Sequence, residues 1–177
     1  MDDFQFTCSS CGEVHQGSPS FGYQEPMQYH SLSQDEKETT AKLGDDICVI
    51  KHQDHTDHFI RVILEVPIHG AVHPFTWGVW ISVSKSNFKK YTDHFRDEAY
   101  EDKYFGWLCN ALPFYPQTIQ LKASASVKPG GERPRIQLEP TDHPLSIDSR
   151  EGVSWQKAVA IAQVAMHPKA NGNPDLK

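Results

Sequence analysis

Apolar and polar positions alternate through the middle of this chain in the pattern of β-strands. The runs DICVIK at residues 46–51 and HFIRVILEVPI at residues 58–68 are rich in β-branched side chains, and the polar segment HQDHTD lies between them. This arrangement predicts a β-hairpin with a longer loop. The run FTWGVWISVS at residues 75–84 places every second apolar side chain on one face, which predicts another strand.

The segment TIQLKASASV at residues 118–127 alternates apolar and polar residues without interruption. It predicts a strand with one solvated face, which is typical of an antiparallel sheet. The turn residues KPGGERP follow it, and RIQLE at residues 135–139 then predicts the return strand of a second hairpin.

Three segments have helical periodicity instead. Ser33 and Glu36 form a capping-box pattern, and Gly44 provides a stop, so we expect a helix over residues 34–43. Aromatic residues spaced i, i+3 and i+7 predict an amphipathic helix over residues 85–96. An apolar stripe predicts a last helix that starts at Ser154 and ends before Pro168.

Hairpin strands with packed helices predict an α+β fold built on one antiparallel sheet with about three helices. The chain has 177 residues, of which 38% are hydrophobic, and this is sufficient for one domain with a packed core. We therefore expect a single domain over residues 1–168, with an N-terminal zinc-ribbon-like knuckle at residues 6–17. The segment 169–177 has nothing to bury and is expected to be a disordered tail.

The formal net charge of −6 argues against nucleic-acid binding, which requires clustered Lys and Arg. The first residues, MDDFQFT, are acidic and lack an apolar run, and no segment has the length of a membrane span. We therefore expect a cytoplasmic protein with no membrane partner, in which the cysteines stay reduced.

The segment CSSCGEVH at residues 8–15 has the sequence form of one knuckle of a zinc ribbon. A Cys-x-x-Cys turn directs two thiolates at one centre, and zinc in structural sites takes four such ligands. We predict that Cys8, Cys11 and Cys48 bind zinc, with His15 as the fourth ligand and His143 as its substitute. The alternatives are a pair of buried thiols at a turn, or a redox pair. The redox interpretation is weaker because no helix is expected to follow the cysteines.

Two other groups of residues have metal-binding chemistry. The loop residues His52, His55 and His58 offer imidazole ligands, although spacing in an extended loop does not place them on one face. The motif EPTDHPL frames Asp142 and His143 with prolines and predicts either a structural turn or a ligand site. A small anionic ligand could be held there by residues that are near in sequence, namely Arg133, Arg135, Arg150 and Glu151.

Among the aromatic residues, Trp77 and Trp155 are expected in the core, while Trp80 is the better candidate for an exposed contact. The run YFGWLC at residues 104–109 is expected to be buried, and this excludes Cys109 from the zinc site.

The order of the segments CSSCGEVH, DICVI, PFTWGVWISVS, YFGWL, LPFYPQT, GGERPRIQLEPTDHPL and REGVS resembles a bacterial family catalogued as domain of unknown function 2199. The resemblance extends roughly from Phe6 to Met166, and LEPTDHPL is its most specific part. It implies a complete single-domain protein and no particular reaction.

The sequence contains no nucleophile elbow and no phosphate-binding glycine loop. We therefore expect a small binding or interaction protein with a structural zinc site, whose partner is a protein or a small anionic ligand. The alternative is a metal-dependent hydrolase with an open zinc site near Asp142 and His143.

Overall fold

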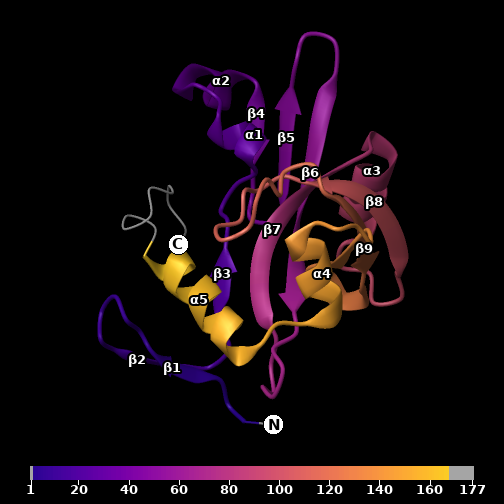
Figure 1. The fold of residues 1–177 in the computed structure, drawn as a ribbon. Coiled ribbons are helices and arrows are strands. Elements are labelled where there is room, and N and C mark those ends of the chain that lie inside the picture. The colour runs from indigo at the N-terminus through magenta and orange to yellow at the C-terminus, as the bar shows by residue number, and fades with distance from the viewer. Residues whose placement is uncertain (1, 168–177) are drawn as a thin grey trace.

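The computed structural model describes residues 2–167, and most of its strands form one strongly curved sheet (Figure 1). The sheet has eight strands in the order β3-β7-β8-β9-β10-β6-β5-β4, and β6 also pairs with β7. The strands are β3 (Ser20–Gly22), β4 (Ala41–Leu43), β5 (Ile47–Lys51), β6 (Thr56–Val66), β7 (Phe75–Val83), β8 (Asp102–Leu108), β9 (Lys122–Val127) and β10 (Arg135–Leu138). A separate pair, β1 (Gln5–Thr7) and β2 (Val14–Gln16), forms a small hairpin.

Strands β6 to β10 close into a five-stranded barrel because β6 has neighbours on both sides. Leu64 of β6 lies opposite Trp77 of β7 and also opposite Ile136 of β10. The contact between β6 and β10 is parallel, whereas the other contacts within the barrel are antiparallel. The mixed α+β class is confirmed, but the predicted antiparallel sheet of hairpins is wrong in its arrangement, because five strands close into a barrel through one parallel contact. Closure pairs strand edges that an open sheet would expose.

The barrel interior is filled by side chains that alternate along each strand. Val62, Trp77 and Val79 are fully buried there, together with the small residues Ala123 and Ala125 of β9. Small residues on one strand leave room for large ones on the facing strands, as a narrow barrel requires. Trp77 therefore has the core position expected from the sequence.

Both predicted hairpins are present, with one change of length. In β5 and β6, Cys48 lies opposite Phe59, and β9 pairs antiparallel with β10. However, β9 begins at Lys122 rather than at Thr118, because residues 118–121 form a turn. The hydroxyl of Thr118 donates a hydrogen bond to the carbonyl of Asn110 at 2.7 Å, and this anchors the turn.

Five α-helices occur within residues 2–167, two more than expected: α1 (Met27–His30), α2 (Gln34–Thr39), α3 (Lys85–His94), α4 (Pro144–Glu151) and α5 (Trp155–Met166). The capping box of α2 is formed by Ser33 and Glu36, but the helix ends before β4, whose residues pair with β5. The predicted helices over residues 85–96 and 154–167 correspond to α3 and α5. The tail predicted over residues 169–177 lies outside the described residues.

Helix α4 replaces the Pro-framed turn that EPTDHPL suggested. His143 is its N-cap residue, and Pro144 occupies its first turn. Proline is favoured at that position because its missing N–H group would have no partner there in any case. The motif therefore starts a helix.

Helix α5 packs between the barrel and the β1–β2 hairpin. Its buried residues are Ala158, Ile161, Ala162 and Ala165. Its first residue, the partly buried Trp155, packs on Phe4 with 4.7 Å between ring centroids and donates from its indole nitrogen to the carbonyl of Gln5. These contacts attach the hairpin to the helix.

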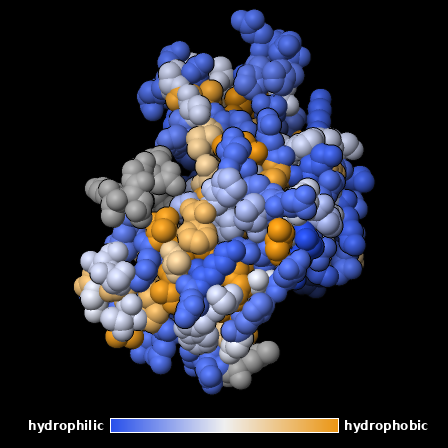
Figure 2. All heavy atoms as spheres, in the orientation of Figure 1, coloured by the Kyte–Doolittle hydropathy of each residue, from blue (hydrophilic) through white to orange (hydrophobic). Residues whose placement is uncertain are grey.

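The face of the molecule shown in Figure 2 is mostly hydrophilic, and its hydrophobic residues are interspersed with hydrophilic ones. Among the described residues, no helix is both long and apolar enough to cross a membrane.

Candidate metal centre

The turn that joins β1 to β2 brings two cysteines and a histidine together. The N–H of Cys8 donates to the carbonyl of Glu13 at 2.8 Å, and the N–H of Gly12 donates to the carbonyl of Cys8 at 2.9 Å. Gly12 has φ +76, a conformation that glycine adopts without steric cost. The strand register then places His15 opposite Phe6, two residues before Cys8.

The ligand atoms of Cys8, Cys11 and His15 all lie within 4.8 Å of one another. The Sγ atom of Cys11 and the Nε2 atom of His15 are 3.5 Å apart. Zinc–sulfur bonds of about 2.3 Å and zinc–nitrogen bonds of about 2.0 Å in a tetrahedron separate sulfur from nitrogen by about 3.5 Å. The three donors are therefore spaced as ligands of one ion would be.

The environment of Cys8 favours the thiolate form. Burial raises the pKa of its thiol, but hydrogen bonds from the backbone of Cys11 and Ser10 and from the side chains of Cys11 and His167 outweigh burial and lower the pKa from 9.0 to about 6. Zinc binds cysteine as thiolate, so this environment suits a metal ligand.

A histidine that the sequence did not single out also reaches this group. The Nε2 atom of His167 lies 3.2 Å from the Sγ atom of Cys8. His167 is the C-cap residue of α5 and precedes Pro168, where the sequence indicates the end of the helix. The sequence indicates only that His167 follows the last apolar residue of the helix. The contact between this helix end and Cys8 is visible only in the folded structure.

Cys48 was predicted as a zinc ligand, and the structure places it elsewhere. It is fully buried in a second core cluster with Phe59, Trp80 and Cys109. Burial, followed by the charges of Glu25 and Cys109, raises the pKa of its thiol to about 12. Its strand β5 lies between β6 and β4 in the eight-stranded sheet, whereas the cysteine turn belongs to the separate β1–β2 hairpin. Cys48 therefore does not join Cys8 and Cys11.

The alternative ligands Asp142 and His143 lie at the start of α4. The Nδ1 atom of His143 accepts a hydrogen bond from the N–H of Leu145 at 3.1 Å, and Asp142 is exposed. Among residues 2–167, neither belongs to a group of three or more side chains able to hold a metal ion. The structure thus gives His143 a helix-capping role.

The arginines proposed for an anionic ligand each have a carboxylate partner. Arg133 contacts Asp46 at 2.6 Å, and Arg135 contacts Glu65 at 3.1 Å. Arg150 lies 3.7 Å from its neighbour Glu151. These contacts neutralise much of the positive charge that an anion would require.

The loop between β5 and β6 forms a second group of possible metal ligands. His52, His55 and Asp57 have ligand atoms within 4.8 Å of one another, and the two imidazole rings stack at 4.3 Å. The expectation that these histidines do not share a face is wrong for His52 and His55, because the loop turns back on itself: the N–H of His52 donates to the carbonyl of His55. His58 lies apart and packs on Phe88.

Trp80 is not the exposed contact that the sequence suggested. It is fully buried in the second core cluster, and its indole nitrogen donates to the carbonyl of Tyr23 at 3.1 Å. The segment around Tyr23 and Tyr29 covers this face of β7, so both faces of the strand are buried at this position.

Two neighbouring exposed aromatic residues lie instead on β8, and Phe114 in the following loop is also exposed. Phe105 is 47% and Trp107 is 40% exposed, and their rings meet edge to face at 5.3 Å. The Nζ atom of Lys122 lies 5.7 Å from the centre of the Trp107 ring. The expectation that YFGWLC is wholly buried is therefore wrong: Tyr104, Gly106 and Leu108 point inward, and the residues between them point outward.

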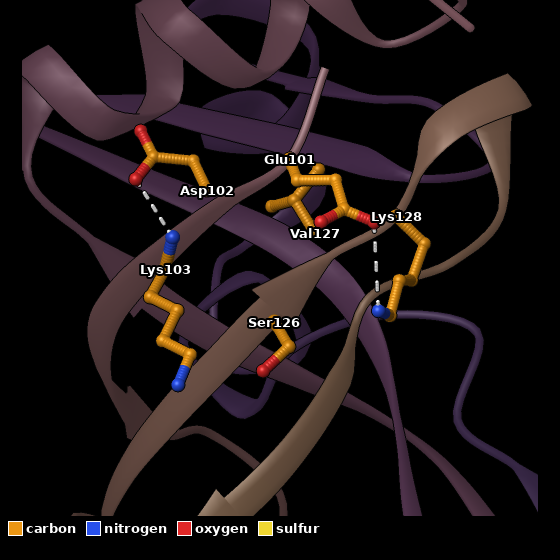
Figure 3. A pocket seen from close by; sticks show the side chains of 6 residues that line it. All are labelled: Glu101, Asp102, Lys103, Ser126, Val127 and Lys128. Atoms are coloured by element: carbon orange, nitrogen blue, oxygen red, sulfur yellow. Dashed lines mark hydrogen bonds and ion pairs between the residues drawn. The ribbon is translucent and has the colours of Figure 1, made fainter. Parts of the chain in front are cut away.

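A shallow hollow over β8 and β9 carries charges that pair with one another (Figure 3). Lys128 contacts Glu101 at 3.7 Å, and Asp102 accepts a hydrogen bond from the backbone N–H of Lys103 at 2.7 Å. Lys90 of α3 also lies 3.4 Å from Asp102. The hollow thus presents no strong excess of either charge.

Comparison with known proteins shows the family to which the chain belongs. No curated protein and no solved structure matches the chain. A family described as an uncharacterised protein conserved in bacteria (DUF2199) matches residues 7–153. The matched segment contains Cys8, Cys11 and His15, whereas His167 follows it. Since the match extends over most of the chain, this protein belongs to the bacterial family DUF2199.

Proposed function

We propose that this chain is a zinc-binding protein whose metal site stabilises its N-terminal hairpin, and that its role is binding rather than turnover. The observation that carries the proposal is the grouping of Cys8, Cys11 and His15 within 4.8 Å. Two different local features produce this grouping, namely the Gly12 turn and the β1–β2 register.

The types of ligand favour zinc over other common ions. Thiolate and imidazole are the ligands of structural zinc sites, whereas magnesium and calcium take oxygen ligands. A Cys-x-x-Cys turn with a nearby histidine provides three of the four ligands that a structural site uses. In the reducing environment expected from the sequence, the same thiols are available to a metal.

The hydrolase alternative has less support. It required an open zinc site near Asp142 and His143, but the first is exposed and the second caps α4 through its Nδ1 atom. Neither residue is grouped with a third ligand among residues 2–167. A catalytic zinc normally has three protein ligands and a water, and the Asp142 region does not offer three.

The aromatic pair on β8 supports a binding role. Aromatic side chains are enriched at protein contact surfaces, and Phe105 and Trp107 are exposed side by side on β8. This surface is distinct from the metal site, so the proposal assigns the metal a structural role and assigns contacts with a partner to the barrel.

The test is elemental analysis of protein purified without a His tag, before and after zinc addition and dialysis. Wild type is expected to hold about one zinc ion per chain. Cys11→Ser should lose the zinc while keeping its fold, because Cys11 is exposed. Cys48→Ala is the matched control and should keep it. The proposal fails if reconstituted wild type holds no zinc, or if Cys11→Ser holds as much as wild type.

A further inference from the structure

We infer that His167 is the fourth ligand of this zinc site, so that the metal joins the N-terminal hairpin to the C-terminal end of α5. This inference rests on the proposed zinc binding and extends it. It predicts a closed Cys₂His₂ site whose ligands come from opposite ends of the described chain.

The first argument is the distance between donors. The Nε2 atom of His167 lies 3.2 Å from the Sγ atom of Cys8, and this is close to the distance of 3.5 Å between Cys11 and His15. Both distances are near the separation of about 3.5 Å expected between sulfur and nitrogen ligands on one zinc ion. Each of the two cysteines therefore has one imidazole nitrogen near the distance that separates a sulfur and a nitrogen ligand of one zinc ion.

The second argument is how α5 is held. Trp155 at its start contacts Phe4 and Gln5, and His167 at its end contacts Cys8. The helix is thus attached to the β1 segment at both ends. Its four buried residues fix it against the core between these two contacts. The position of His167 is consequently set by packing along the whole helix.

The third argument is the number of ligands. Cys8, Cys11 and His15 leave one position of a tetrahedral ion open, and structural zinc sites are closed by four protein ligands. His167 touches the group through Cys8 only, so closure requires its ring to turn toward Cys11 and His15 as the ion binds. His167 is the C-cap residue of α5 and is half-buried, so its ring is not enclosed in the core.

The test compares untagged wild type, His167→Ala and the exposed-histidine control His73→Ala. Zinc affinity is measured by competition with a chelator, and cobalt is used as a spectroscopic substitute for zinc. We expect His167→Ala to bind zinc at least about 10–100-fold more weakly than wild type, since even residues that only support metal ligands contribute that much. Its cobalt spectrum should also show an altered coordination number, and added imidazole should restore it. His73→Ala should match wild type in both measurements.

The possible failures are distinguishable. If wild type and His167→Ala bind zinc with affinities within a factor of ten and give the same cobalt spectrum, the inference is wrong and the proposed zinc binding stands. If wild type binds no zinc, both the proposed function and the inference are wrong. Circular dichroism of His167→Ala excludes a general loss of fold as the cause, because the substitution is at the end of α5 and outside the core.

Discussion

The Sγ atom of Cys8 and the Nε2 atom of His167 lie 3.2 Å apart, although 159 positions separate them in the chain. One residue is in the turn after β1, and the other ends α5. A metal bound at this contact would constrain both ends of the described structure, since a ligand that binds only the folded state stabilises it. The stability of the hairpin and of α5 is therefore expected to depend on zinc.

Removal of zinc by a chelator should loosen the hairpin and the last turn of α5 before it affects the barrel. We expect faster amide exchange at Cys8 and at His167, whose N–H groups bond to Glu13 and Gln163. The amides that join β6 to β7 should stay protected, because their pairing does not involve the site. Hydrogen exchange with and without the chelator measures this. Uniform loss of protection across both regions would contradict a local role for the metal.

Tyr91→Phe should leave the free energy of unfolding unchanged or raise it by up to about 1 kcal/mol. The hydroxyl of Tyr91 is buried and has no hydrogen-bond partner among the described residues, so its removal relieves a desolvation cost. Tyr104→Phe is the matched control. Its hydroxyl lies 2.8 Å from that of Tyr100, and loss of this hydrogen bond should lower stability by about 1 kcal/mol. Urea unfolding of both variants measures the difference. A larger loss of stability for Tyr91→Phe than for Tyr104→Phe would contradict the description of the Tyr91 hydroxyl as unpaired.

Stability should decrease at alkaline pH because several tyrosines are buried. Burial raises the pKa of Tyr23 and Tyr91, and burial together with the hydroxyl of Tyr100 raises that of Tyr104. In the unfolded chain these groups ionise near pH 10, whereas in the folded protein they stay protonated. Their contribution is therefore complete below about pH 10 and is lost as the pH rises, by about 1.4 kcal/mol per pH unit for each such tyrosine.

Guanidinium unfolding between pH 8 and pH 11 measures this alkaline loss. Tyr91→Phe should reduce the slope above pH 10, since it removes one of the ionising groups. If the slope of the variant equals that of wild type, Tyr91 is not protected from ionisation in the folded state.

Gly106→Ala should destabilise the barrel by about 1–3 kcal/mol, the usual cost of overpacking a core. A Cβ atom at Gly106 would lie 2.6 Å from the backbone oxygen of Ser82 and 2.9 Å from the side chain of Ile81. Gly44→Ala is the control, because the nearest atoms to its added Cβ are at 3.6 Å and belong to Ile47. Thermal unfolding of the two variants is the measurement. Equal midpoints would show that β7 and β8 are not packed as described.

The sequence predicted the local elements better than the closure of the barrel. Strands β5, β6 and β7 and helices α3 and α5 follow from alternation and helical periodicity, which are local signals. The pairing of β6 with both β7 and β10 depends on strand twist and on which edges meet, and neither leaves a periodic pattern in the sequence. The same limit explains why Trp80, on a strand buried on both faces, was expected to be exposed.

In the metal site, too, the local part could be predicted from the sequence and the long-range part could not. Cys8, Cys11 and His15 lie within eight residues of continuous sequence, so their spacing alone indicated a shared centre. The choice of Cys48 depended on how distant strands are arranged, and the structure does not bring it to the other two cysteines: Cys48 lies in the core cluster around Trp80, and β5 and the hairpin belong to different sheets. His167 could not be found from spacing, since only the packing of α5 brings it to Cys8.

X-ray absorption at the zinc edge of the untagged, zinc-loaded protein tests the central claim most directly. It reports the types of atom bound to the metal and their distances. We predict a four-coordinate shell with two sulfur atoms at about 2.3 Å and two imidazole nitrogens at about 2.0 Å. A shell without sulfur, or protein that takes up no zinc at all, would contradict the assignment of the metal to Cys8, Cys11, His15 and His167.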